Sequence, residues 1–349
     1  MDISIAGILM LDGLTNGAIY GLLGLVTVLV FTVTRIIFIP QGEFVAYGAL
    51  TLAFLQAGKV PGTLWMLLIL ALTSALMRVF SILKNATIDN KFSASIKVTL
   101  RTLAFPLLIS LVTYWLAPLK TDLWIQALLS VAMVSAFGPL VYHVAFESLE
   151  DASPLVLLIV SVAVHFAMTG FGLLFFGAEG YRNPNFWAYS AEIFQLRLSG
   201  QAIIIFISAL VLICLLWLFF ENTLYGKALR ATAINRNGAR LMGVSTQTSG
   251  QLTFTLATFL CAVSGLLIGP TTTVFYDSGF LIGLKGFVAA VMAGLVSYPL
   301  AMVGALFVGI VESFGSFWAS AFKEVIVFTL ILIVLLLRTL RSGSVSEEH

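Results

Sequence analysis

The sequence predicts an all-α fold, a polytopic transmembrane helical bundle of about 10–11 membrane segments. Hydrophobic residues make up 60% of the 349 residues and charged residues only 10%, and the mean hydropathy is +1.07. Ordinary globular domains are roughly half apolar and a quarter charged. A bilayer accommodates such an excess of apolar surface, whereas a water-soluble fold does not. We therefore expect residues 1–349 to form a single multi-pass domain embedded in a lipid bilayer.

A membrane-spanning helix needs roughly 20 mostly apolar residues. About eleven candidate segments of this kind follow one another along the chain. They are Ile5–Val33, Glu43–Ala57, Leu64–Leu83, Val98–Leu116, Leu123–Val144, Pro154–Phe176, Ala202–Phe220, Gln247–Ile268, Phe280–Val296, Leu300–Ala319 and Val325–Leu340. The second and the ninth are short, which is typical of broken or re-entrant helices. The first segment follows Asp2, with neither a basic start nor a cleavage site, so we expect a retained span rather than a signal peptide.

The positions of lysine and arginine predict the orientation in the membrane. Basic residues follow the first segment (Arg35), fill the connection Lys84–Lys97 and the stretch Glu221–Gly243, and recur in the tail after Leu337. Counting the segments places all four regions on one side, and cytoplasmic loops carry such an excess. We expect the N-terminus outside and the C-terminus in the cytoplasm. The acidic connection Glu147–Asp151 falls on the same side as the cations.

Several kinds of chemistry are absent from the sequence. The formal net charge of +2 gives no reason to expect nucleic acid as a partner. Cys214 and Cys261 lie in separate apolar runs and are expected to be small buried hydrophobes. There is no phosphate-binding loop, zinc-protease motif or nucleophile elbow. We expect no catalytic residue, metal or cofactor, and any ATP hydrolysis has to come from a partner.

The cytoplasmic stretch 221–245 is expected to form a compact helical hairpin. Two interpretations stay open at this point: a basic loop at the lipid headgroups, or a docking element for a soluble partner. Small residues allow another protein to approach the backbone closely, while cations at the rim fix its orientation. The candidate docking residues are Gly226, Lys227, Ala228, Arg230, Ala231, Asn235, Ala239 and Gly243.

Polar side chains inside the predicted spans are few, and a charge at mid-bilayer costs about 2.5–3.5 kcal/mol on insertion scales. Glu43 is expected either at the cytoplasmic interface or at a functional position, and Glu312 either pairs within the bundle or lines a wet cavity. Lys285 is expected to reach outward to the interface. His165 is expected to be hydrogen-bonded in the bundle or to belong to a proton relay.

Four stretches match a known family in order. They are Gly13–Leu22, Arg35–Phe44, Gly226–Gly243, and Lys285 through Glu312 continuing into Lys323–Val325. The second is similar to the family signature R-I-I-N-F-A-H-G-E, and the third to its cytoplasmic loop G-R-A-L-R-A. The chain resembles the LivH-type membrane permeases of importers for branched-chain (hydrophobic) amino acids, which belong to the ATP-binding cassette (ABC) class.

The resemblance implies a permease subunit of a bacterial or archaeal-type cytoplasmic (inner) membrane. Its partners would be a second permease subunit, identical or different, two cytosolic ABC ATPases and an extracytoplasmic solute-binding protein. Residues 221–245 would then be the coupling loop that sits in an ATPase groove. For the translocation pathway, the candidates are Asn16, Gln41, Glu43 and Glu312.

Three departures from the family pattern stand out. Residues 62–120 add a pair of apolar segments and a basic loop, which leaves the orientation of everything downstream unchanged. Gln41 and Phe38 replace the histidine and asparagine of the signature. The stretch Ala293–Ala301 lacks several glycines of the corresponding family motif. The second and third changes bear on the solute more than on the architecture.

Three other functions remain alternatives. A stand-alone secondary carrier or channel would need no ATPase, but ion-coupled carriers usually place ionisable groups near the midplane and this chain offers few. A non-transporting membrane scaffold subunit is the second alternative. A membrane enzyme is the third, and candidate catalytic groups for it are lacking.

Overall fold

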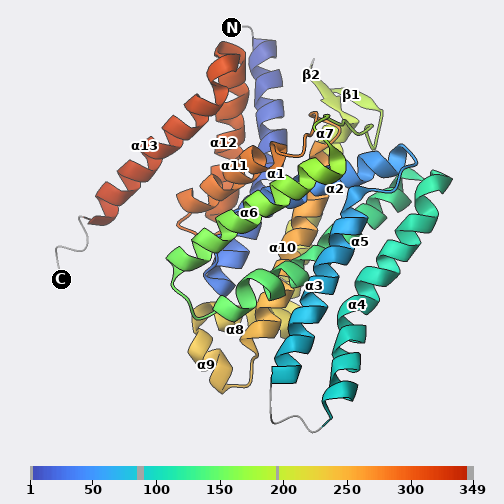
Figure 1. The fold of residues 1–349 in the computed structure, drawn as a ribbon. Helices are drawn as coiled ribbons and strands as arrows, with labels where there is room; N and C mark the ends of the chain where they lie inside the picture. Colours follow the sequence, from blue (N-terminus) through green and yellow to red (C-terminus); the bar gives the residue numbers. More distant parts are fainter. Residues whose placement is uncertain (1–2, 85–89, 194–195, 344–349) are drawn as a thin grey trace.

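The computed structural model describes residues 3–84, 90–193 and 196–343, and this part of the chain is a helical bundle (Figure 1). The helices are α1 (Ile3–Thr34), α2 (Gln41–Gln56), α3 (Gly62–Lys84), α4 (Lys91–Leu116), α5 (Leu123–Val141), α6 (Pro154–Phe176), α7 (Gly200–Asn222), α8 (Leu224–Ile234), α9 (Arg236–Leu241), α10 (Thr246–Ile268), α11 (Ser278–Met292), α12 (Tyr298–Trp318) and α13 (Lys323–Gly343). A short antiparallel hairpin, β1 (Ser190–Ile193) and β2 (Leu196–Ser199), precedes α7 and was not predicted. The all-α prediction is confirmed.

Every predicted membrane segment corresponds to one helix of the structure. Within the described residues, eight helices are long and apolar enough to cross a membrane: α1, α3, α4, α5 with its extension to Leu149, α6, α7, α10 and α12. The two segments predicted to be short are α2, with 16 residues, and α11, with 15 residues. In α13, the side chains of Arg338 and Arg341 lie outside the described part.

The core is built around α1 and α2. Helix α1 contacts α10, α11 and α12, and α2 contacts α5, α10 and α11. A set of buried aromatic rings joins α2 to α5 and α10, with Phe44 stacked near Phe38 and edge-on to Phe137. At Gly42 the backbone of α2 crosses that of α11, since a Cβ added there would lie 1.9 Å from the carbonyl oxygen of Gly279. Small residues at such crossings let helices pack without the hydrophobic effect to drive them.

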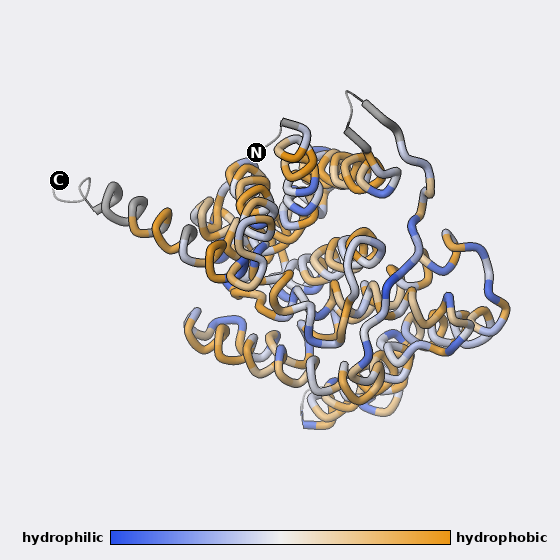
Figure 2. The backbone as a smooth tube through the Cα atoms, turned by 90° about the horizontal axis from the view of Figure 1, so that it is seen from above, coloured by the Kyte–Doolittle hydropathy of each residue, from blue (hydrophilic) through white to orange (hydrophobic). Residues whose placement is uncertain are grey.

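The α3–α4 pair and helix α13 lie at the edge of the bundle. Helices α3 and α4 contact each other and α5, and they expose large apolar side chains such as Phe80 and Leu100. The predicted additional pair, residues 62–120, packs one side against the core, with Leu67 and Ala71 buried, and leaves its other side exposed. Helix α13 contacts α11 and α12 and projects away from the other helices (Figures 1 and 2). Apolar residues dominate the helices around the outside of the bundle (Figure 2).

The two ends of the bundle differ in composition. The start of α1 and the β1–β2 hairpin lie at one end, whereas α8, α9 and the facing ends of α3 and α4 lie at the other (Figure 1). Two of the basic regions predicted to share one side therefore lie at the same end: the described ends of α3 and α4 beside the connection Lys84–Lys97, and the α8–α9 hairpin. Part of the connection Lys84–Lys97, residues 85–89, lies outside the described residues. The side of the membrane that this end faces stays a prediction.

Candidate functional site

The stretch 221–245 forms a hairpin of two short helices, α8 and α9, whose ends are fixed by capping. The hydroxyl of Thr223 accepts a hydrogen bond from the backbone N–H of Gly226 at 2.9 Å, and the side chain of Asn235 accepts one from Gly238 at 2.9 Å. Such caps satisfy backbone donors that a helix start leaves open. The hairpin ends at Gly243, whose φ of +84° suits glycine. Asn235 and Gly243, both predicted docking residues, thus stabilise the start and the end of α9.

The hairpin divides its predicted docking residues between an inner and an outer side. Gly226 and Ala239 are buried and Ala228 is half-buried. A Cβ on Gly226 would lie 2.2 Å from the carbonyl oxygen of Phe219, so glycine lets α8 fold back onto α7. Exposed predicted residues are Lys227, Arg230, Ala231, Asn235 and Gly243.

Sequence reasoning missed the apolar side chains on the outer side of the hairpin. Leu224, Leu241 and Met242 are 84%, 88% and 85% exposed. The helical spacing of Leu224, Lys227 and Ala231 places these three on one face of α8. This spacing could have revealed the exposed face of α8 from the sequence alone. Apolar side chains left bare together indicate an interaction surface. We call the exposed residues Leu224, Lys227, Ala231, Leu241 and Met242 the outer face of the hairpin.

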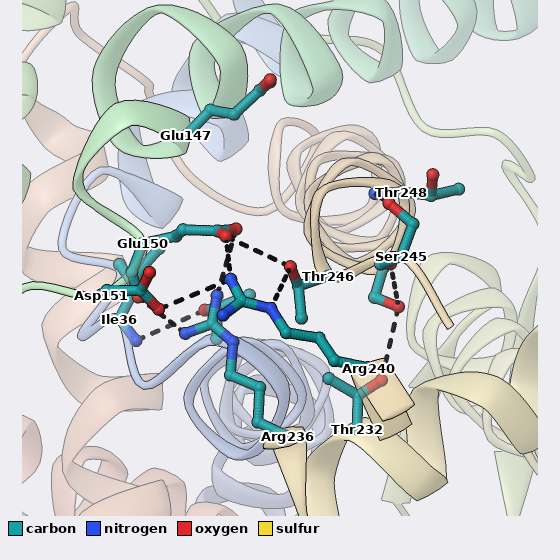
Figure 3. A network of polar contacts seen from close by, with 12 residues as sticks. Ile36, Glu147, Glu150, Asp151, Thr232, Arg236, Arg240, Ser245, Thr246 and Thr248 are labelled. Atoms are coloured by element: carbon teal, nitrogen blue, oxygen red, sulfur yellow. Dashed lines mark hydrogen bonds and ion pairs between the residues drawn. The ribbon is translucent and has the colours of Figure 1, made fainter. Parts of the chain in front are cut away.

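An acidic clamp holds the inner side of the hairpin (Figure 3). Arg236 donates to the backbone oxygen of Glu150 at 2.7 Å and to its carboxylate at 3.3 Å, and Arg240 donates to the same carboxylate. The hydroxyl of Thr246 donates to this carboxylate at 3.2 Å. The Glu150 side chain is only 15% exposed. Glu150 therefore ties the hairpin to the α5–α6 connection and to the start of α10.

The clamp accounts for the acidic connection on the cationic side of the predicted topology. Glu150 and Asp151 neutralise arginines of the hairpin, with Asp151 at 3.5 Å from Arg240. Glu147 accepts from Gln251 at 3.2 Å and lies 2.7 Å from His143. The cations that were expected at the rim of a partner groove are thus in part engaged within the chain itself.

Glu43 lies deep in the bundle, so the expectation of an interface position is wrong. Its side chain is fully buried, and one carboxylate oxygen lies 2.7 Å from Nδ1 of His165 on α6. The expectation that His165 is hydrogen-bonded in the bundle is confirmed. The other oxygen, Oε2, has no hydrogen-bond partner among the described residues. A carboxylate without a partner is too costly to bury. The contact with His165 therefore stabilises Glu43 in the core and links α2 to α6.

Gln41 is buried and ties three helices together. Its amide nitrogen donates to the carbonyl oxygen of Gly283 on α11 at 2.9 Å, and its amide oxygen accepts from the hydroxyl of Thr27 on α1 at 2.9 Å. Asn16 is half-buried on α1. The structure does not bring Asn16 into hydrogen-bond contact with the other predicted pathway residues among the residues it describes.

A second buried network joins α1, α11, α12 and α13. The ammonium of Lys285 lies 2.6 Å from the carboxylate of Glu312 and 3.1 Å from that of Glu324. The hydroxyl of Tyr20 donates to Glu312 at 2.7 Å. Lys285 is only 4% exposed, so the expectation that it reaches outward is wrong: the two carboxylates hold its charge inside. Of the alternatives for Glu312, pairing within the bundle is the observed one.

Comparison with known proteins identifies the family. The family described as the permease component of branched-chain amino acid transport systems matches residues 9–336. That match covers nearly the whole chain, including every apolar helix described above. The chain belongs to this family.

Individual relatives agree with the assignment. The permease is 29% identical to the high-affinity branched-chain amino acid permease protein LivH of Salmonella typhimurium over 214 residues, 59% of this chain and 70% of the relative. It is 31% identical to BraD of Pseudomonas aeruginosa over 216 residues, 60% of this chain and 70% of the relative. A probable LivH of Methanocaldococcus jannaschii is 32% identical over 123 residues, 34% of this chain and 39% of the relative. No solved structure matches the permease.

The family fixes the broad role of the molecule. It is a permease subunit of an amino acid transporter rather than an enzyme, and a multi-pass protein of the inner membrane. The predicted resemblance to LivH-type permeases is confirmed. The buried pairs and the clamped hairpin described above are thus features of a transport subunit.

The first prediction concerns the buried lysine. Replacing Lys285 by Met leaves the carboxylates of Glu312 and Glu324 without their cation. We expect a loss of about 3–5 kcal/mol of stability, because breaking a buried ion pair strands a charge. The thermal unfolding midpoint of the purified permease in detergent measures the loss. Lys323→Met is the matched control, since Lys323 is exposed and 4.0 Å from Glu324. Equal midpoints for both variants would contradict the prediction.

The second prediction concerns the clamp. Glu150→Gln keeps the shape of the side chain but removes the charge that pairs with Arg236 and Arg240. We expect amide hydrogen exchange over residues 236–243 to become roughly tenfold faster, because charge-assisted hydrogen bonds restrain local opening. Asp151→Asn is the control: Asp151 is 73% exposed, and exposed pairs contribute little. Unchanged exchange in Glu150→Gln would show that capping alone holds the hairpin.

Proposed function

We propose that the permease is the transmembrane subunit of an ATP-binding cassette importer for branched-chain or other neutral amino acids. It pairs with a second permease, of the same or a different kind, and is driven by two cytosolic ATPases. An extracytoplasmic solute-binding protein delivers the solute. The observation that carries the proposal is the rigid α8–α9 hairpin, which presents apolar and cationic side chains away from the bundle.

The outer face of the hairpin has the chemistry of a docking surface. Leu224, Leu241 and Met242 supply apolar area, and Lys227 supplies a cation for orientation. Ala231 on the same face of α8 leaves the backbone open to close approach. The surface is pre-organised because Glu150 and the helix caps hold its inner side, which lowers the entropy cost of binding.

The source of energy follows from what the sequence lacks. The chain contains no phosphate-binding loop, so this proposal assigns ATP hydrolysis to a partner. The clamp offers that partner a mechanical route into the membrane. A push on the hairpin acts through Arg236 and Glu150 on the α5–α6 connection and through Thr246 on α10. In this proposal, α3 and α4 are an addition at the lipid-facing edge that leaves this route unchanged.

The solute is proposed to be a branched-chain or other neutral, hydrophobic amino acid. The relatives LivH and BraD are named for branched-chain amino acid transport. The ionisable groups inside this bundle bind one another: Glu43 with His165, and Lys285 with Glu312. A charged solute side chain would compete with these pairings for a counter-charge, whereas a neutral side chain needs none.

A subunit exchange tests the solute. We expect an importer in which this permease is replaced by a relative of different specificity to change its uptake of leucine relative to other amino acids. The reason is that the permease lines the path that every solute must cross. Radiolabelled uptake in proteoliposomes measures the ratio, with the binding protein held constant. An unchanged ratio would assign solute choice to the binding protein alone.

The docking proposal is tested at Ala231. Ala231→Trp places a large ring on the outer face, and we expect co-purification of the ATPase to fall at least about tenfold because the close approach is blocked. Ala231→Ser, which keeps the side chain small, is expected to retain the ATPase. Both variants should be monodisperse, since the residue is exposed. If Ala231→Trp keeps the ATPase and ATP-driven uptake, the hairpin is not the docking element and a secondary carrier becomes the better account.

A further inference from the structure

An apolar cavity lies beneath α8, on the side of the hairpin opposite its outer face. Its volume is about 750 Å³, it is partly open to the surface of the chain, and residues of α1, α7, α8 and α12 line it. Its walls are formed mainly by Leu25, Ile213, Leu216, Trp217 and Met302, with Tyr298 at the first turn of α12. None of the groups proposed for the transport pathway lines it. The cavity is therefore a separate feature of the molecule.

The cavity lies toward one end of the spanning helices. Its lining residues come from the C-terminal parts of α1 and α7 and from the start of α12, all of which are membrane spans. Helix α7 is the least buried of the eight spans, so the cavity opens on an exposed apolar side of the chain. The α7 residues of the wall run from Ile213 to Glu221, about 14 Å of helix. A spanning partner helix would need a groove roughly 30 Å long, whereas this one ends beneath α8.

The walls favour an acyl chain over water or a polar solute. Buried water requires two or more polar partners, and the deep wall of this cavity consists of aliphatic, aromatic and thioether side chains. A zwitterionic amino acid would find no partner for its charges there. A hydrocarbon chain from the surrounding bilayer loses nothing on entering and restores the dispersion contacts that an empty space lacks.

The mouth of the cavity carries charge at the level of the lipid headgroups. Arg230 lines the mouth, and its Nη2 donates to the carbonyl oxygen of Phe220 at 2.6 Å and lies 3.0 Å from the carboxylate of Glu221. Among the described residues, Nη2 makes both contacts, so Nε and Nη1 remain available as donors. Each of these N–H groups can donate one charge-assisted hydrogen bond to a phosphate oxygen.

From this arrangement we infer that the cavity is a binding site for one anionic phospholipid. An acyl chain fills the apolar space, and the headgroup phosphate lies against Arg230. The lipid then supports α8 from the membrane side, opposite the outer face that is proposed to meet the ATPase. This inference does not depend on the proposed importer function, because the site is formed by the permease alone.

Native mass spectrometry of the purified full-length permease tests the site, with dioleoyl phosphatidylglycerol and dioleoyl phosphatidylcholine added in turn. We expect wild type to retain one phosphatidylglycerol and Leu216→Trp, which fills the cavity, to lose it. Leu215→Trp is the matched control: the neighbouring residue is 53% exposed and does not line the cavity. Met302→Phe, from the opposite wall, repeats the test if Leu216→Trp does not fold.

The headgroup is tested separately. Arg230→Gln is expected to reduce the preference for phosphatidylglycerol over phosphatidylcholine roughly tenfold while keeping the chain site. Free glycerol 3-phosphate at millimolar concentration is expected not to displace the lipid. Three results would overturn the inference: equal lipid retention by Leu216→Trp and Leu215→Trp, displacement by glycerol 3-phosphate alone, or disulfide crosslinking of Trp217→Cys to a second permease, which would make the cavity a protein interface.

Discussion

The ionisable side chains buried in the core of the bundle are paired with one another there, and this constraint organises the permease. Water cannot solvate these groups, and lipid offers nothing in exchange. Lys285 accordingly forms ion pairs with Glu312 and Glu324, and the carboxylate of Glu43 contacts His165. The two pairings connect α11 with α12 and α13, and α2 with α6. Helices that share few apolar contacts, such as α13, are thereby fixed at a defined place on the core.

At the end of the bundle that carries α8 and α9, the same electrostatics serve a different purpose. Glu150 is partly exposed to solvent, so its bonds to Arg236 and Arg240 cost less to form than a buried pair and also stabilise less. What the clamp adds is connectivity. It links a hairpin that lies outside the membrane to the α5–α6 connection and, through Thr246, to α10. Because α10 packs against α1, α2 and α5, the hairpin is connected to the core of the permease.

The sequence was sufficient to predict the helices but not the buried ion pairs and hydrogen bonds between them. Length and hydropathy alone located each span, and small residues and cations marked the hairpin before any contact was known. The partners of the buried groups could not be predicted because they are distant in the chain. Between His165 and Glu43 the separation is 122 residues, and between Tyr20 and Glu312 it is 292. Lys285 was misplaced for this reason. Judged by its own segment it had a short route outward, and the carboxylates that hold it come from α12 and α13.

The hairpin also shows why position in the sequence is a poor guide to role. Its most conspicuous residues, Gly226, Asn235 and Gly243, shape the turns and the close approach to α7. Arg230, on the same helix, points back to the cavity mouth, where it contacts Phe220 and Glu221. Bare leucine and methionine side chains remain on the outside. In the proposals made above, an ATPase touches that outer face, a lipid supports the opposite side, and Glu150 holds the hairpin between them. A displacement of the hairpin would then compress the lipid site and pull on the clamp together, so that both resist the same movement.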